Sequence, residues 1–291
     1  MRRYPGFEDL APWDVAKLAT RKFLNHDMVT YAAALSYHLL LALFPFIIFL
    51  LTLLGGLGLS DFFDRILRQA RTALPPDGFL LLEQVVSEIR GQPREGLLSV
   101  SIILALWAAS AGMRAVMNAI NVAYAVTETR PPWKRFLLSL VYTIGLAILV
   151  VAAAGLMLVG PQAADWLADR FGVAARMAGL WAWLRWPVII MLLLLTVALI
   201  YYFAPTIAQP FRYITPGSIS AVMVWILASF GFSYYVDNFG VYGATYGSLG
   251  GMVVLLLYFF VAAAVLLLGA EINATIHPAH GPDSAEITTR E

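Results

Sequence analysis

Long runs of apolar residues alternate with short polar segments along this chain. Six runs reach about 20 residues or more, the length that a helix needs to cross about 30 Å of hydrocarbon. A membrane β-barrel would instead show short segments of alternating polarity. The pattern therefore predicts an all-α, polytopic membrane protein with six transmembrane helices. The predicted spans are residues 31–59, 97–125, 136–160, 186–205, 216–236 and 246–272.

Amphipathic segments lie outside the predicted spans. Before the first span, Trp13, Ala16, Thr20 and Phe23 share one helical face, which predicts a helix on the membrane surface. Residues 61–93 carry two apolar stripes separated by two prolines, which predicts a helical hairpin on the outer face. The tryptophan-rich segment 166–186 predicts a further interfacial element between spans 3 and 4.

The six spans predict one membrane domain over residues 1–276, followed by a disordered polar tail at 277–291. An even number of spans puts both termini on one side of the membrane. Basic residues in the amino-terminal segment and in the loop after span 2 place both termini in the cytoplasm. The arginines of the loop from 60 to 96 argue the other way, although six acidic residues are interleaved with them.

Composition agrees with the membrane assignment. Hydrophobic residues make up 60% of the 291 residues, charged residues 13%, and the mean hydropathy is +0.77. A formal net charge of +1 argues against a nucleic-acid partner, which would need a concentrated basic face. The chain has no cysteine, so disulfides and thiol chemistry are excluded.

Three strongly ionisable residues, His38, Arg114 and Glu271, lie in or at the edge of the apolar runs. Charge in hydrocarbon is costly unless it finds a partner or water, so each is a candidate site residue. The predicted topology puts all three in the cytoplasmic half of the membrane, with Arg114 about 16 Å from the cytoplasmic edge at 1.5 Å per residue.

Asn118 and Asn121 follow Arg114 at i+4 and i+7, so the three share a helical face that should look into the bundle. One interpretation is a cytoplasm-facing polar pocket in which Arg114, Asn118, Asn121, His38 and Glu271 bind an anionic headgroup. In the other interpretation, Arg114 pairs with Glu271 or with amide and backbone groups and merely braces the helices. For His38 a satisfied core imidazole is the simpler interpretation.

Gly243, Gly247 and Gly251 repeat at every fourth position. Such a ridge of small residues is typical of close helix packing, within one chain or between chains of an oligomer. No zinc-binding HExxH, GxSxG or Walker motif occurs, so the sequence predicts no enzyme, no metal site and no cofactor.

The segments TYAAALSYHLLLALFPFIIFLL, RPPWKRFLLSL and YGSLGGMVVLLLYFFVAAAVLLLGAEINA resemble the BrkB/YihY family of bacterial inner-membrane proteins, over about residues 14–276. The resemblance implies six spans with both termini cytoplasmic and suggests links to envelope lipid export and to resistance to serum killing. Members were once labelled ribonuclease BN. The resemblance supplies no catalytic residues to carry over.

These observations predict an inner-membrane protein that binds or transports an amphipathic anion, a phospholipid or a lipid A-type envelope lipid. The first alternative is a non-transporting scaffold whose outer hairpin at 61–93 docks an envelope protein. The second is a membrane-bound ribonuclease, which the lack of clustered metal-binding carboxylates disfavours.

Overall fold

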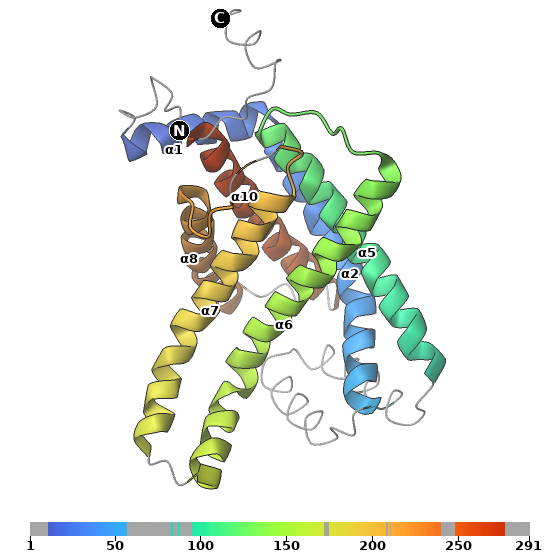
Figure 1. Cartoon of the computed structure of the whole chain (residues 1–291), viewed down its shortest axis with the longest axis vertical. Helices are drawn as coiled ribbons and strands as arrows, with labels where there is room; N and C mark the ends of the chain where they lie inside the picture. The colour runs from blue at the N-terminus through green and yellow to red at the C-terminus, as the bar shows by residue number, and fades with distance from the viewer. Residues whose placement is uncertain are drawn as a thin grey trace, which may run out of the picture. The chain divides into compact units, whose positions relative to one another are not determined.

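The computed structural model describes residues 11–56, 83, 87, 95–171, 175–207, 209, 211–239 and 248–276. Every regular element in this part of the chain is a helix (Figure 1). The helices are α1 (Pro12–Asn25), α2 (Met28–Gly56), α5 (Glu95–Ala123), α6 (Pro132–Phe171), α7 (Ala175–Phe203), α8 (Pro216–Phe239) and α10 (Ser248–Ile276). The all-α prediction is confirmed for these residues.

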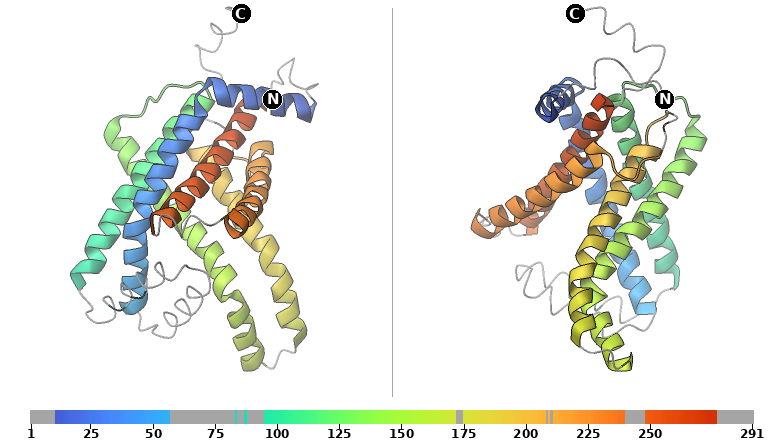
Figure 2. Two further views of the ribbon diagram at one scale, coloured as in Figure 1. Left: turned by 180° about the vertical axis from the view of Figure 1, so that it is seen from behind. Right: turned by 60° about the vertical axis from the view of Figure 1, so that its left-hand side comes forward.

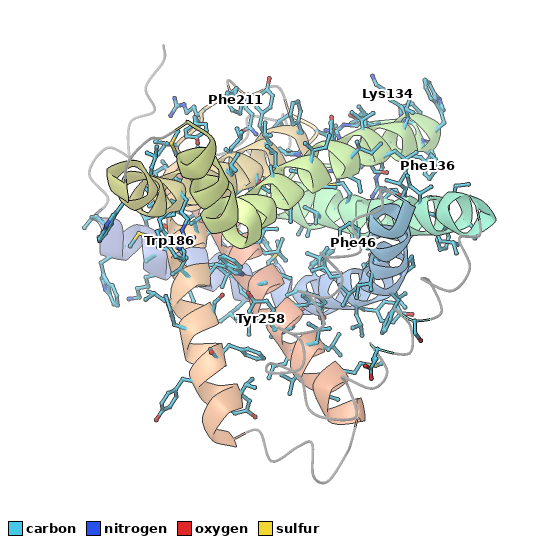
Figure 3. The ribbon with its side chains drawn as sticks, turned by 90° about the horizontal axis from the view of Figure 1, so that it is seen from below. Phe46, Lys134, Phe136, Trp186, Phe211 and Tyr258 are labelled. Atoms are coloured by element: carbon cyan, nitrogen blue, oxygen red, sulfur yellow. The ribbon has the colours of Figure 1, made fainter. Side chains whose placement is uncertain are left out.

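All of these helices except α1 are long and apolar enough to cross a membrane, which confirms the six predicted spans among the described residues. Their apolar windows are mostly not covered by protein: 28% of the α5 window is buried and only 6% of the α6 window. Phe136, Trp186 and Phe211, labelled in Figure 3, are each more than 40% exposed. A surface this apolar requires lipid around it.

The helices α6 and α7 run side by side in opposite directions and are longer than predicted (Figures 1 and 2). The 40 residues of α6 span about 60 Å, roughly twice the thickness of the hydrocarbon. Segment 166–186 does not form a separate element in the described residues, because α6 continues to Phe171 and α7 begins at Ala175. Its position at the membrane interface remains a prediction. The alanine, leucine and methionine residues of this segment are strong helix formers.

The chain divides into two compact units. Unit 1 comprises residues 1–31, 113–226 and 264–291, and unit 2 comprises residues 32–112 and 227–263. The division falls within four helices, α2, α5, α8 and α10. The single membrane domain over 1–276 remains a prediction.

The amphipathic segment before the first span forms α1, which belongs to unit 1. Pro12 takes the first helical position, where its missing N–H costs nothing. After the helix ends, Asp27 adopts a positive φ of 53°, which turns the chain before α2 begins at Met28. Phe23 is half-buried, whereas Leu24 shares the exposed face with Trp13, so the predicted apolar face differs by one residue.

The end of α5 sets the course of the loop toward α6. Ala125 has a φ of 51°, its N–H donates to the Val122 carbonyl, and the N–H of Val126 donates to the Asn121 carbonyl. These two bonds form a Schellman motif, which stops the helix and satisfies its last carbonyls. The loop that follows carries Glu128 and Arg130.

Several predictions concern residues outside those that the structure describes. They are the helical hairpin at 61–93, the tail at 277–291, and the first two glycines of the packing ridge, Gly243 and Gly247. The third, Gly251, has no atom of the described residues within 4 Å of where a Cβ would lie. The close-packing role of this ridge remains a prediction.

Candidate functional site

Arg114 reaches from α5 to the start of α6, within unit 1. Its Nη1 donates to Ser139 Oγ at 3.2 Å, and its guanidinium carbon lies 5.2 Å from the centre of the Phe136 ring. Ser139 is fully buried, and its hydroxyl in turn donates to the Phe136 carbonyl. The cation is therefore held between a hydroxyl group and an aromatic face of α6.

Asn118 lies one turn further along α5, where it contacts another arginine, Arg135 of α6. Arg135 Nη2 donates to Asn118 Oδ1 at 2.6 Å and to the Arg114 carbonyl at 3.0 Å. The two guanidinium groups therefore lie on the same face of α5, as the spacing of Arg114 and Asn118 predicts. Their positive charges are brought together rather than separated.

Asn121, the third residue of the face, is 3% exposed and has hydrogen bonds through both ends of its amide. Its Nδ2 donates to Glu128 Oε2 at 3.1 Å, while its Oδ1 accepts the backbone N–H of Thr206 at 2.9 Å and the Thr206 hydroxyl at 3.2 Å. Asn121 thus ties the loop after α5 to the segment after α7. A buried amide whose two ends are both hydrogen-bonded stabilises the contact between these two segments.

Glu128 is a carboxylate that Arg130 and Arg135 share. Arg130 Nε lies 3.8 Å from Glu128 Oε1, and Arg135 Nε lies 3.7 Å from Glu128 Oε2. The same carboxylate accepts hydrogen bonds from the Arg130 backbone N–H and the Thr206 hydroxyl. Arg114, Arg130 and Arg135 thus form, with Glu128, a cluster that carries two more positive charges than negative ones.

Arg130 joins this cluster to the end of α7. Its Nη2 donates to the carbonyls of Ala204 and Pro205, which α7 leaves without helical partners. Its Nη1 is buried and has no hydrogen-bond partner among the described residues. Arg130 therefore caps a helix and still retains hydrogen-bond donors that its protein neighbours do not use.

An open cleft of about 440 Å³ lies beside Arg130 in unit 1. Its aromatic wall is made by Tyr142 of α6 and by Tyr202 and Phe203 of α7, and Tyr142 stacks on Phe203 with ring centres 5.0 Å apart. The remaining lining residues are Pro205, Ile207 and Gln209. The cleft thus combines one cation with apolar and aromatic walls, the chemistry that suits an anion attached to an apolar body.

Glu271 lies elsewhere in unit 1 and does not pair with Arg114. It is fully buried, and its Oε1 lies 2.7 Å from Nδ1 of His26, which follows α1. The interpretation in which Arg114 and Glu271 brace each other is therefore wrong, because His26 takes that place.

Asn273, two residues beyond Glu271, fastens α10 to the start of α8. Its Oδ1 accepts the Gly217 N–H at 2.9 Å, and its Nδ2 donates to Thr215 Oγ1 at 3.0 Å. Gly217 and Gly269 allow the two helices to approach, since a Cβ on Gly269 would lie 2.6 Å from the Gly217 carbonyl oxygen. This polar group caps a helix and is no part of the cleft.

His38 belongs to unit 2, whereas the other four predicted site residues belong to unit 1. Its ring lies 6.0 Å from that of Tyr37, and its Cβ lies 3.4 Å from where a Cβ on Gly112 would be. Arg114, Asn118 and Asn121 are therefore the predicted residues that the structure brings together in one cluster.

The sequence pattern does not single out His26, Glu128, Arg130, Arg135 or Thr206 as site residues. Arg130 and Arg135 enter it only as basic residues that indicate the topology. One signal was available: two asparagines and an arginine on an apolar helix require polar partners, and the next charged side chains along the chain are Glu128, Arg130, Lys134 and Arg135.

Comparison with known proteins supports the resemblance found in the sequence. The model of a family described as virulence factor BrkB matches residues 19–289. The putative ribonuclease-like protein YfkH of Bacillus subtilis (strain 168) is 36% identical over 256 residues, which cover 88% of this chain and 92% of that protein.

More distant relatives are called UPF0761 membrane proteins. Those of Stenotrophomonas maltophilia (strain R551-3) and Alkalilimnicola ehrlichii are 26% and 24% identical over 88% and 90% of this chain. The chain spans 59% and 58% of the length of these two proteins. No solved structure matches the chain.

Proposed function

This chain belongs to the virulence factor BrkB family of membrane proteins, and on that premise we propose that it binds the anionic headgroup of a membrane lipid. The lipid is a phospholipid or a lipid A-type envelope lipid, and binding is the first step of its movement across or along the inner membrane. The site is the Arg114, Arg130, Arg135 and Glu128 cluster together with the adjoining cleft, and it opens toward the cytoplasm.

The cleft beside Arg130 is the observation that carries this proposal. A soluble anion such as free phosphate would be held by polar groups alone, whereas this cleft sets the guanidinium of Arg130 and the amide of Gln209 beside three aromatic rings and two aliphatic side chains. An amphipathic anion fits both parts, with its phosphate or carboxylate at Arg130 and its apolar body along Tyr142 and Tyr202. The excess of two positive charges in the cluster favours a net negative ligand.

In this proposal, some residues of unit 1 hold the arginines in position and others attract the ligand. Glu128 and Asn121 hold Arg130 and Arg135 in place, and Thr206 closes the network toward the end of α7. Arg130 lines the cleft and places its positive charge beside the ligand, while Arg114 adds long-range attraction from α5. Arginine suits this role because its planar guanidinium binds phosphate oxygens in pairs and is not deprotonated.

RNA cleavage, which the name of the Bacillus relative suggests, is a weaker candidate. Metal-dependent hydrolysis needs clustered carboxylate or histidine ligands, and the part of the chain that the structure describes has no group of three or more such side chains. The carboxylate of Glu128 is engaged by arginine, threonine and asparagine side chains.

Lipid binding is tested by native mass spectrometry of the full chain, purified in detergent and titrated with phosphatidylglycerol. Arg130→Gln is expected to weaken binding about tenfold or more, because each charge-assisted hydrogen bond to a phosphate contributes about 1.5–3 kcal/mol. Arg185→Gln is the matched control, since Arg185 is a cation of α7 that lies over Trp186 and is no lining residue of the cleft.

A second variant separates the cleft from the fold, because Arg130 also caps α7. Ile207→Trp leaves every charge and cap in place and narrows the cleft, so it should weaken phosphatidylglycerol binding as well. Unchanged binding in both folded variants, relative to Arg185→Gln, would disprove the cleft as the lipid site.

A further inference from the structure

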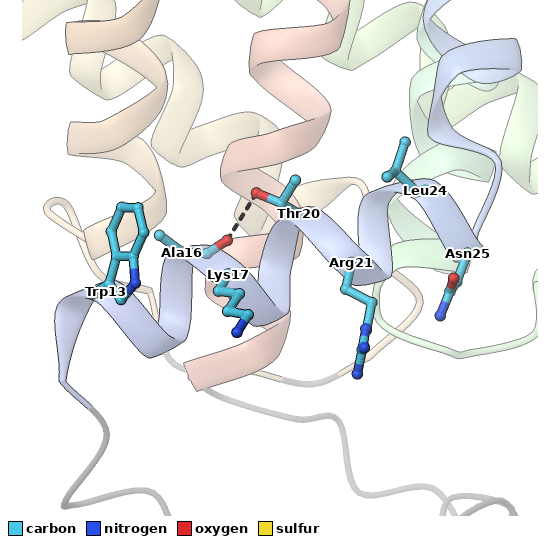
Figure 4. Close-up of a pocket in the computed structure, with 7 residues that line it drawn as sticks. All are labelled: Trp13, Ala16, Lys17, Thr20, Arg21, Leu24 and Asn25. Atoms are coloured by element: carbon cyan, nitrogen blue, oxygen red, sulfur yellow. Dashed lines mark hydrogen bonds between the residues drawn. The ribbon is translucent and has the colours of Figure 1, made fainter.

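The outer face of α1 carries two parallel rows of side chains that no other described residue of unit 1 covers. Trp13, Ala16, Thr20 and Leu24 form an apolar row, in which Trp13 is 77% and Leu24 63% exposed. Lys17, Arg21 and Asn25 form a polar row at intervals of four residues. The two rows lie side by side along the helix (Figure 4), and their seven side chains line a shallow hollow of about 420 Å³.

The one polar side chain of the apolar row is already satisfied. The Thr20 hydroxyl donates to the Ala16 carbonyl at 2.8 Å, within the same helix. The hydroxyl therefore has no need of water. The indole N–H of Trp13 is the other side-chain donor of the row, and at a membrane interface it can donate to headgroups or water while its ring lies among apolar groups.

The inner side of α1 is fixed within unit 1, so the helix is held in place. Ala19 is fully buried, Val15 and Leu18 are half-buried, and His26 binds the buried Glu271 just beyond the end of the helix. Packing therefore determines which face α1 turns outward.

The position of α1 along the chain defines what covers that face. Asp27 turns the chain, and the apolar window of the first membrane span begins at Met28, three residues after Asn25. A helix that ends so close to a span lies at the level where hydrocarbon gives way to lipid headgroups. Tryptophan and leucine on one side with lysine and arginine on the other match that boundary.

Charge selects among lipids at this boundary. Lys17, Arg21 and Lys22 outnumber the single acidic residue of α1, Asp14. We propose that the outer face of α1 is a binding surface for acidic phospholipids, with Trp13 and Leu24 inserted among the acyl chains and Lys17 and Arg21 on the headgroup phosphates. This surface is distinct from the cleft beside Arg130, and neither proposal depends on the other.

The absence of cysteine from the chain makes a site-specific test direct. Ala16→Cys is labelled with an environment-sensitive fluorophore, and the full chain is placed in nanodiscs of phosphatidylcholine alone or of equimolar phosphatidylcholine and phosphatidylglycerol. Lipid-borne nitroxide should quench the label, and the quenching should be stronger with phosphatidylglycerol. A water-borne quencher should reach a label at Asn25→Cys several-fold more readily than a label at Ala16→Cys.

Charge reversal then tests selectivity. Adding Lys17→Glu and Arg21→Glu to the labelled chain should abolish the dependence on phosphatidylglycerol, while the neutral pair Lys17→Gln and Arg21→Gln should reduce it. Both pairs are at exposed positions, and their thermal unfolding midpoints serve as the check on folding.

Two results would overturn the proposal. Equal access of the water-borne quencher to positions 16 and 25 in both kinds of nanodisc would show that α1 is not in the interface. Protection of position 16 from both quenchers would show that protein, such as a second copy of the chain, covers this face.

Discussion

Two buried polar residues, Glu271 and Asn121, have partners that lie far away along the sequence. Glu271 is fully buried and finds its partner in His26, 245 positions away. Asn121 reaches Thr206, 85 positions away, by two hydrogen bonds. The periodicity of α5 predicts that Arg114, Asn118 and Asn121 share a face, but it carries no information about which distant residues meet that face.

The His26 and Glu271 pair leads to a prediction about stability. His26→Ala leaves a buried carboxylate without its partner and should lower the free energy of unfolding by about 1–3 kcal/mol. The double variant His26→Ala, Glu271→Met removes the unpaired carboxylate as well and should recover much of the loss. Thermal unfolding in detergent measures both variants, and a single variant as stable as the parent protein would contradict the pairing.

The candidate site could be predicted from the sequence only in part, for a physical reason. Arginine and asparagine residues in an apolar run are conspicuous, because hydrocarbon penalises them. Glu128, Arg130 and Arg135 lie in a short polar loop and at the start of a helix, where charged residues are ordinary and water satisfies them. Only the folded arrangement distinguishes an arginine that lines a cleft from one that lies in water.

At the scale of elements, the positions of the helices along the chain were predicted better than the contacts between them. The apolar runs locate all six long helices, since the bilayer requires long uninterrupted helices. The extension of α6 and α7 beyond their apolar windows was missed, because a helix can continue into water once its residues favour it. The glycines that matter for the α8 and α10 contact, Gly217 and Gly269, form no sequence ridge and come from two different helices.

This helix contact predicts a contrast between two glycine substitutions. In Gly269→Ala the new Cβ would lie 2.8 Å from the Ala221 Cβ and would meet the Tyr201 hydroxyl, which already donates to the Leu266 carbonyl. Overpacking of this kind should lower stability by about 1–3 kcal/mol or more. Gly145→Ala on α6 is the control, because no described atom lies within 4 Å of its Cβ position, and it should be neutral or stabilising by up to about 1 kcal/mol.

The thermal unfolding midpoints of the two variants in the same detergent measure this difference in stability. Equal midpoints for Gly269→Ala and Gly145→Ala would mean that α8 and α10 do not approach as closely as described.

For the molecule as a whole, exposed apolar surface occurs on all six long helices of the described residues, whereas the arginine cluster and the cleft belong to unit 1 alone. Six helices present mostly uncovered apolar windows, as a membrane protein must. The arginine cluster, the cleft and the amphipathic α1 all belong to unit 1, while His38 belongs to unit 2. Unit 1 therefore contains both proposed lipid contacts, one for a single bound anion and one for the membrane surface.

The central claim is that an amphipathic anion occupies the cleft beside Arg130. A cryo-electron microscopy structure of the full chain in nanodiscs that contain phosphatidylglycerol tests it most directly. The account predicts phosphate density within hydrogen-bond distance of the Arg130 guanidinium, with acyl density along Tyr142 and Tyr202. A cleft that contains only water, beside well-ordered lipids bound elsewhere on the protein, would contradict it.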